Sequence, residues 1–164
     1  MIVVSDTTPL ISLLKADALS LLEPLFKEVL VPDAVFSELT SNPDFQMEAE
    51  IIRKCPFIKV VTVKEPEAVK LLQRATGLDL GESEAIIYAD DTNADVLLMD
   101  EIRGRQIAKS MGIYIMGTIG VLLFAYEEKI LSGFEVAEIL DKLKKSNRHI
   151  SDELIEYALS KIQL

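Results

Sequence analysis

Short apolar runs alternate with amphipathic stretches along the chain, and two of these runs stop abruptly at an aspartate. The first run, Ile2–Val4, is typical of a strand buried on both faces at the centre of a parallel sheet. Further strands are predicted at residues 28–31, 58–63, 95–100 and 112–116. In the segments between these runs, apolar residues recur at the spacing of a helix. The alternation predicts an α/β fold built on a parallel sheet.

The expected helices differ in how clearly the sequence marks their ends. Prolines suit several helix starts, and Gly77 is expected to end one helix in the left-handed conformation. The segment 10–25 predicts one or two short helices broken near Asp17. The other helices are expected at 32–39, 43–55, 65–76, 77–89, 101–111, 117–127, 134–145 and 151–162. A length of 164 residues fits one domain, 1–164, with a C-terminal helical pair at about 133–163.

Composition narrows the possible chemistry. The apolar runs are too short to span a bilayer, and the N-terminus lacks the features of a signal peptide, so no membrane association and a cytoplasmic location are expected. The chain has one cysteine, Cys55, and one histidine, His149. These numbers exclude an internal disulfide and an all-Cys/His zinc site, and they disfavour a Cys-His nucleophilic pair.

The net charge of −10 argues against long-range attraction to nucleic acid. This objection weakens if several carboxylates are clustered around divalent cations, because a bound ion reverses the local field. The dense basic cluster at residues 142–149 has two interpretations, a solvated helix end or an RNA-contact patch.

Two aspartates follow apolar runs directly. Asp6 ends the first run among small hydroxyl residues that include Thr7, and Asp100 ends the run that begins at Val96. Ligands of open α/β sheets gather at the carboxyl ends of the strands, so the two aspartates should lie side by side if their strands are neighbours. The alternative for Asp6 is a turn residue or helix N-cap.

Two glutamates border buried helix faces. Glu38 lies three residues after Val35, and Glu82 shares a face with Ala85, whereas Glu84 points elsewhere. An inward-facing acid needs a partner or a cation. The alternatives are a solvated helix flank for Glu38 and a favourable helix dipole for Glu82.

Arg105 is the candidate basic residue near these acids. It follows Asp100 and Glu101, and it shares a helix face with Lys109. Contact with a substrate phosphate and simple neutralisation of nearby acids remain equally open.

Asp6, Glu38, Glu82 and Asp100 suggest one kind of chemistry when they are taken together. Packed without a cation, these carboxylates would repel one another. Mg²⁺ or Mn²⁺ prefers such oxygen ligands together with waters and substrate phosphates. Phosphodiester hydrolysis suits this arrangement and requires no histidine.

The ordered acids resemble those of the PIN-domain ribonucleases, including the VapC-type toxins, over nearly the whole chain. Val4-Ser-Asp-Thr-Thr-Pro-Leu-Ile11 and Val31-Pro-Asp-Ala-Val-Phe-Ser-Glu38 are similar to the first two acidic motifs of the family. Gly81-Glu-Ser-Glu-Ala-Ile-Ile-Tyr-Ala89 and Val96-Leu-Leu-Met-Asp100 are similar to the third and fourth. The usual spacing of the last two acids in the family selects Glu82 over Glu84. Glu at the third position and Leu-Met before the fourth acid depart from the common pattern.

The resemblance implies a three-layer α/β/α fold and a Mg²⁺- or Mn²⁺-dependent endoribonuclease. It implies that Asp6, Glu38, Glu82 and Asp100 hold the ion. Thr7 and Arg105 are the candidate substrate contacts beside them. A homodimer and an antitoxin partner are further implications. The alternative is a catalytically weak PIN-like scaffold that binds RNA or protein. A receiver or phosphatase with Asp6 as nucleophile is disfavoured, because no Asp-x-Asp pair or suitably placed lysine follows the relevant strands.

Overall fold

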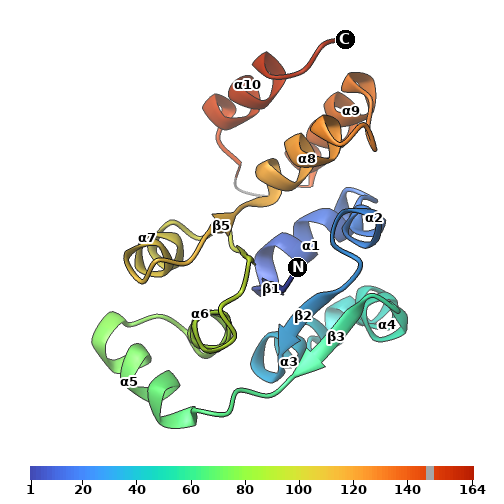
Figure 1. The fold of residues 1–164 in the computed structure, drawn as a ribbon. Coiled ribbons are helices and arrows are strands. Elements are labelled where there is room, and N and C mark those ends of the chain that lie inside the picture. The colour runs from blue at the N-terminus through green and yellow to red at the C-terminus, as the bar shows by residue number, and fades with distance from the viewer. Residues whose placement is uncertain (147–149) are drawn as a thin grey trace.

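The computed structural model describes residues 1–146 and 150–164. Within them, one parallel sheet has the strand order β3-β2-β1-β4-β5 (Figure 1). The strands are β1 (Val3–Ser5), β2 (Val29–Pro32), β3 (Ile58–Val61), β4 (Val96–Leu98) and β5 (Ile115–Met116). The parallel sheet predicted from the apolar runs is confirmed, and β3, β4 and β5 are shorter than their runs.

Strand pairing determines where the two aspartates emerge. β1 is the central strand and pairs with β4 in a register that sets Ser5 beside Leu98. The N–H of Asp6 then donates to the carbonyl of Leu98 at 3.0 Å. Asp6 and Asp100 therefore leave neighbouring strands at the same edge of the sheet, as predicted.

The helices occupy the segments that the sequence marked for them. The break expected near Asp17 is present, since this residue has φ 55°, and Gly77 ends its helix with φ 73°. The segment 43–55 begins with a 3₁₀ turn, Pro43–Phe45, and a second such turn is Leu19–Leu21. The α-helices are α1 (Thr7–Lys15), α2 (Leu22–Phe26), α3 (Asp33–Thr40), α4 (Gln46–Lys54), α5 (Pro66–Thr76), α6 (Leu80–Asp91), α7 (Ile102–Ser110), α8 (Thr118–Glu127), α9 (Gly133–Lys145) and α10 (Asp152–Ser160).

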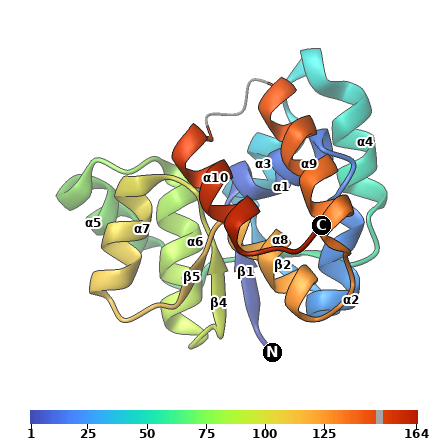
Figure 2. The ribbon, with the colours of Figure 1, turned by 90° about the horizontal axis from the view of Figure 1, so that it is seen from above.

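Helices cover both faces of the sheet, which gives the expected three-layer α/β/α fold (Figures 1 and 2). On one face α6 packs against β1, β2 and β4, and α5 and α7 pack beside it. On the other face α1 packs against α8 and α9. α3 contacts both α1 and α6, so it brings its side chains to the edge where β1 ends.

The central strands are buried from both sides, which explains why their sequences are continuously apolar. Val3, Val4, Leu97 and Leu98 are at most 1% exposed. Each such side chain contributes about 1.5–3 kcal/mol relative to an exposed position. This rigid centre fixes the backbone at Asp6, the first polar side chain after β1.

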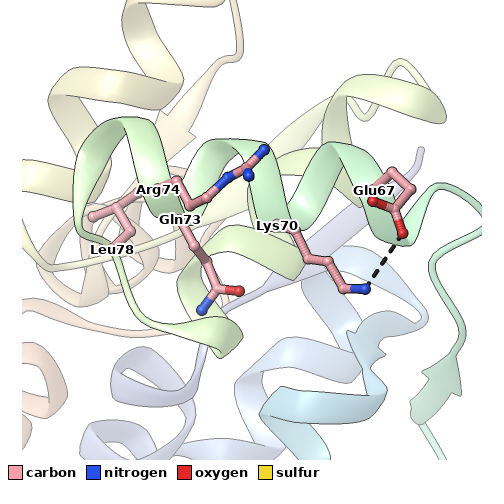
Figure 3. Close-up of a pocket in the computed structure, with 5 residues that line it drawn as sticks. All are labelled: Glu67, Lys70, Gln73, Arg74 and Leu78. Carbon is pink, nitrogen blue, oxygen red and sulfur yellow. Dashed lines mark hydrogen bonds and ion pairs between the residues drawn. The ribbon is translucent and has the colours of Figure 1, made fainter.

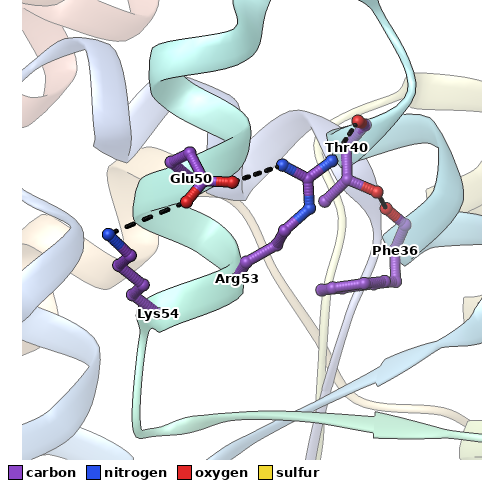
Figure 4. Close-up of polar contacts among 5 residues, drawn as sticks. All are labelled: Phe36, Thr40, Glu50, Arg53 and Lys54. Atoms are coloured by element: carbon purple, nitrogen blue, oxygen red, sulfur yellow. Dashed lines mark hydrogen bonds and ion pairs between the residues drawn. The ribbon is translucent and has the colours of Figure 1, made fainter.

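A polar network ties α4 to the end of α3 (Figure 4). The guanidinium of Arg53 donates to Glu50 at 2.7 Å and to the carbonyl of Thr40 at 2.9 Å. The hydroxyl of Thr40 donates to the carbonyl of Phe36 at 2.8 Å. The bond from Arg53 to Thr40 joins α4 to the helix that carries Glu38.

The last two helices lie within the span predicted for the C-terminal pair, and both pack on α8. The one-domain organisation stays a prediction. In the basic cluster, Lys142 pairs with Asp17 at 3.6 Å and Lys145 with Asp141 at 2.7 Å. Residues 147–149 of that cluster lie outside the described part of the chain.

In the segments 1–146 and 150–164, none of the helices has the length and apolar character needed to cross a bilayer.

Candidate functional site

Asp6 lies directly after β1 and is only 3% exposed. It occupies the N-cap position of α1, yet its side chain makes no capping hydrogen bond. Burial is the main cause that raises the pKa of this carboxyl from 3.8 to about 7, against a backbone hydrogen bond from Thr7 that lowers it. Nearby Glu82, Asp79 and Glu38 raise the pKa further. Asp6 is thus the buried centre of a group of acids.

Glu38 reaches this group from α3. The hydroxyl of Thr7 donates to its Oε2 at 2.7 Å, and Thr7 is itself buried. A Cβ at Gly81 would stand 3.0 Å from the same oxygen, so a glycine there lets α6 begin close to the carboxylate. Thr7, proposed as a substrate contact, therefore positions Glu38 in this structure.

Glu82 enters from the first turn of α6. It forms a capping box with Asp79: the N–H of Glu82 donates to Asp79 Oδ1 at 2.8 Å, and the N–H of Asp79 donates to Glu82 Oε2 at 3.0 Å. Burial chiefly raises the pKa of Glu82; the hydrogen bond from Asp79 lowers it, and the charges of Asp79, Glu101 and Glu38 raise it. Asp79 was not among the predicted site residues, although the spacing Asp-x-x-Glu is a recognised capping signal.

Glu84 has a structural contact instead. Its Oε2 accepts the N–H of Ala34 at 2.9 Å, in the first turn of α3. The face analysis that separated Glu84 from Glu82 agrees with this arrangement. Glu84 thus supports the helix that carries Glu38.

Replacing Glu84 by Ala is expected to lower the free energy of unfolding by about 1 kcal/mol, the usual cost of losing a helix cap. The reason is that the N–H of Ala34 loses its acceptor. Urea denaturation followed by circular dichroism measures the change. Glu84→Gln keeps an acceptor oxygen and should retain most of the stability; an equal loss in both variants would contradict this role.

Asp100 stands at the same edge but has its own partner. Its Oδ1 accepts the N–H of Thr118 at 2.7 Å, and its Oδ2 accepts the hydroxyl of Thr118 at 2.7 Å. Asp100 is not among the groups that shift the pKa of Asp6. The carboxylates of Glu38 and Glu82 thus lie near enough to Asp6 to raise its pKa, whereas the Asp100 carboxylate is held at the start of α8.

Arg105 lies beside Asp100. Its Nη1 donates to the carbonyl of Met99 at 2.8 Å, and a Cβ at Gly117 would approach both Asp100 Oδ1 and Arg105 Nη1 within 3.0 Å. Both side chains line a hollow of about 830 Å³ between α7, β5, α8 and α10. A role for Arg105 in substrate binding stays a prediction.

A hollow of about 450 Å³ along α5 offers different chemistry (Figure 3). It is lined by Glu67, Lys70, Gln73, Arg74 and Leu78. Lys70 Nζ lies 3.3 Å from Glu67 Oε1. These residues include a single carboxylate, Glu67, and it is paired with Lys70. The acids around Asp6 are therefore the better candidate site.

The acids around Asp6 lack a basic counterpart. In the part of the chain that the structure describes, no ion pair involves Asp6, Glu38 or Glu82. Carboxylate oxygens of this kind suit Mg²⁺ or Mn²⁺. The same described residues contain no group of three or more acids already close enough to hold an ion. Three of the predicted ligands are each hydrogen-bonded within the protein instead: Glu38 to Thr7, Glu82 to Asp79, and Asp100 to Thr118.

The sequence also matches a known family over most of its length. A family model described as a PIN domain matches residues 2–164. Among curated proteins, none matches the chain significantly. PIN domains are typically nucleases, and those nucleases generally use divalent metal ions. On the match over nearly its whole length, the chain belongs to the PIN-domain family.

Proposed function

We propose that this protein is a Mg²⁺- or Mn²⁺-dependent endoribonuclease that hydrolyses RNA phosphodiester bonds. The observation that carries the proposal is the buried Asp6, whose pKa of about 7 reflects its burial and the carboxylates of Glu82, Asp79 and Glu38 around it. Such a group costs free energy unless a cation compensates it. The chain belongs to a family whose members are typically nucleases, which supports a catalytic role for this destabilising carboxylate.

The proposed ligands are Asp6, Glu38, Glu82 and Asp100, from the ends of β1 and β4 and from helices α3 and α6. When bound, the ion supplies Lewis-acid activation of a water and neutralises charge at the leaving oxygen. The hydroxyl of Thr7 donates to Glu38 and so positions this carboxylate near the end of β1. Thr118 holds Asp100 through two hydrogen bonds, which fixes that carboxylate at the edge of the sheet.

Cleavage of labelled single-stranded RNA in Mn²⁺, Mg²⁺ or EDTA tests the proposal. The wild type should cut only with an added divalent ion, and Asp100→Asn should reduce the rate by at least about 100-fold, because even residues that merely orient ligands cost about 10–100-fold. Glu84→Gln is the matched control, since Glu84 contacts α3 rather than Asp6. Equal cutting by Asp100→Asn and the wild type would remove Asp100 from the site.

The same assay distinguishes the proposed nuclease from the alternative, a catalytically weak scaffold. The net charge of −10 favours that alternative, because it opposes association with RNA when no cation is bound. Calorimetric uptake of Mn²⁺ without cleavage of any RNA in a varied set would support the scaffold. Uptake with cleavage supports the nuclease.

Three finer expectations belong to the same proposal. Resemblance to VapC-type toxins suggests the toxin of a toxin–antitoxin pair, held by an antitoxin that inserts near the acids. A homodimer and a cytoplasmic location are proposed on the same resemblance.

A further inference from the structure

A small hollow of about 240 Å³ opens beside the acids, between α1, α3 and α4. Thr7 and Glu38 form one end of it, so the hollow begins at the hydrogen bond that positions a proposed ligand. The lining residues come from these three helices and the turn between the last two: Thr7, Ile11, Leu14, Lys15, Glu38, Leu39, Asn42, Phe45, Glu48 and Ile52.

The far end of the hollow carries an aromatic ring. Phe45 is 40% exposed, and the turn that presents it is fixed by Asn42, whose side-chain oxygen accepts the N–H of Asp44 at 3.0 Å. Lys15 Nζ lies 5.0 Å from the centre of the Phe45 ring. An exposed ring beside a cation is a surface on which another flat ring can stack.

We propose that this hollow receives one unpaired nucleobase of the RNA, next to the phosphate that is cut. This proposal rests on the proposed function and adds a base subsite to it. The base would stack on Phe45. The side-chain amide of Asn42 and the carboxylate of Glu48 would supply a donor and an acceptor for its edge.

Size and charge favour a nucleobase over other occupants. Drug-sized ligands fill pockets of about 300–1,000 Å³, so a hollow of about 240 Å³ suits a single ring system rather than a length of peptide. Glu38 and Glu48 line it, and their charges disfavour a phosphate inside. The base therefore enters the hollow while the phosphate stays at the acids.

A scan with abasic nucleotides tests the subsite. Fluorescence anisotropy with Ca²⁺ in place of Mg²⁺ or Mn²⁺ measures the Kd of short labelled RNAs that each lack one base. In the wild type, one abasic position should raise Kd roughly 5- to 100-fold, the range expected for one stacked base. In Phe45→Ala, the intact RNA should bind more weakly by a similar factor, and the abasic position should no longer matter.

Three controls separate stacking from other effects. Phe45→Trp should keep the sensitivity to the abasic position, and Phe45→Leu should lose it although the side chain stays apolar. Phe134→Ala removes an exposed phenylalanine, 70% exposed on α9, that lines no part of this hollow, and should bind like the wild type. Thermal melting by circular dichroism checks that each variant is folded.

The outcomes are distinct from those of the cleavage assay. An abasic penalty that persists in Phe45→Ala, or full binding of the RNA by Phe45→Leu, would overturn the subsite. Absence of RNA binding would overturn it as well. Binding with the expected penalty but no metal-dependent cleavage would leave the subsite standing and overturn the nuclease.

Discussion

In metal-free buffer at pH 8, Asp6→Asn is expected to be more stable than the wild type by up to about 4 kcal/mol. The pKa of Asp6 is raised from 3.8 to about 7 in the folded protein, mainly by burial, so ionisation opposes folding. The stabilising contribution of the protonated carboxyl is complete below pH 3.8 and is lost as the pH rises through 7. An amide of the same shape avoids this loss because it does not ionise.

Urea denaturation at several pH values measures the effect. The advantage of Asp6→Asn should shrink as the pH falls from 8 to 4, because the wild-type carboxyl is then protonated in the folded state. Asp90→Asn, which removes an exposed charge from α6, is the matched control and should change stability much less. A less stable Asp6→Asn at pH 8 would show that the charged carboxyl supports the fold.

The same substitution should remove activity. RNA cleavage is expected to fall by at least about 100-fold, since Asp6 is the proposed ligand at the centre of the acids. Greater stability combined with lost activity is typical of a residue kept for function at the expense of stability. Cleavage rates for the two proteins in Mn²⁺ measure the loss, and equal rates would exclude Asp6 from the reaction.

Mn²⁺ should stabilise the wild type, and the gain should grow from pH 6 to pH 8. A cation binds the deprotonated carboxylate, so binding competes with the proton that Asp6 retains up to about pH 7. At 100 times its Kd, an ion that binds only the folded state adds about 2.7 kcal/mol, which corresponds to a rise in Tm of roughly 5–10 °C for a chain of this size.

Differential scanning calorimetry with and without Mn²⁺ measures this shift. Asp6→Asn should show little of it, whereas Glu84→Gln should behave like the wild type, because the Glu84 carboxylate contacts α3. A shift of the same size in Asp6→Asn, or one that does not change with pH, would place the ion elsewhere on this acidic protein.

Local patterns predicted the parts of the fold that local forces determine. The continuous apolar runs identified the strands, and Gly77 ended its helix in the left-handed conformation as expected. The strand ends placed Asp6 and Asp100 at one edge, because parallel strands in one sheet share their carboxyl ends. Helical periodicity separated Glu82 from Glu84 correctly.

Contacts between distant segments could not be predicted in the same way. Asp100 bonds Thr118, and Glu84 caps a helix that begins far earlier in the chain. Each contact depends on how the helices pack on the sheet, and this packing cannot be predicted from the spacing of residues in the sequence. Asp79 differs, because its capping box is local and could have been found from the pattern alone.

Anomalous diffraction from a crystal soaked in Mn²⁺ tests the central claim most directly, because it locates the ion itself. The expected result is manganese bound by Asp6 together with Glu38, Glu82 and Asp100. Manganese found only at other acids, with Asp6 unbound and the bond from Thr7 to Glu38 intact, would contradict the proposed metal site.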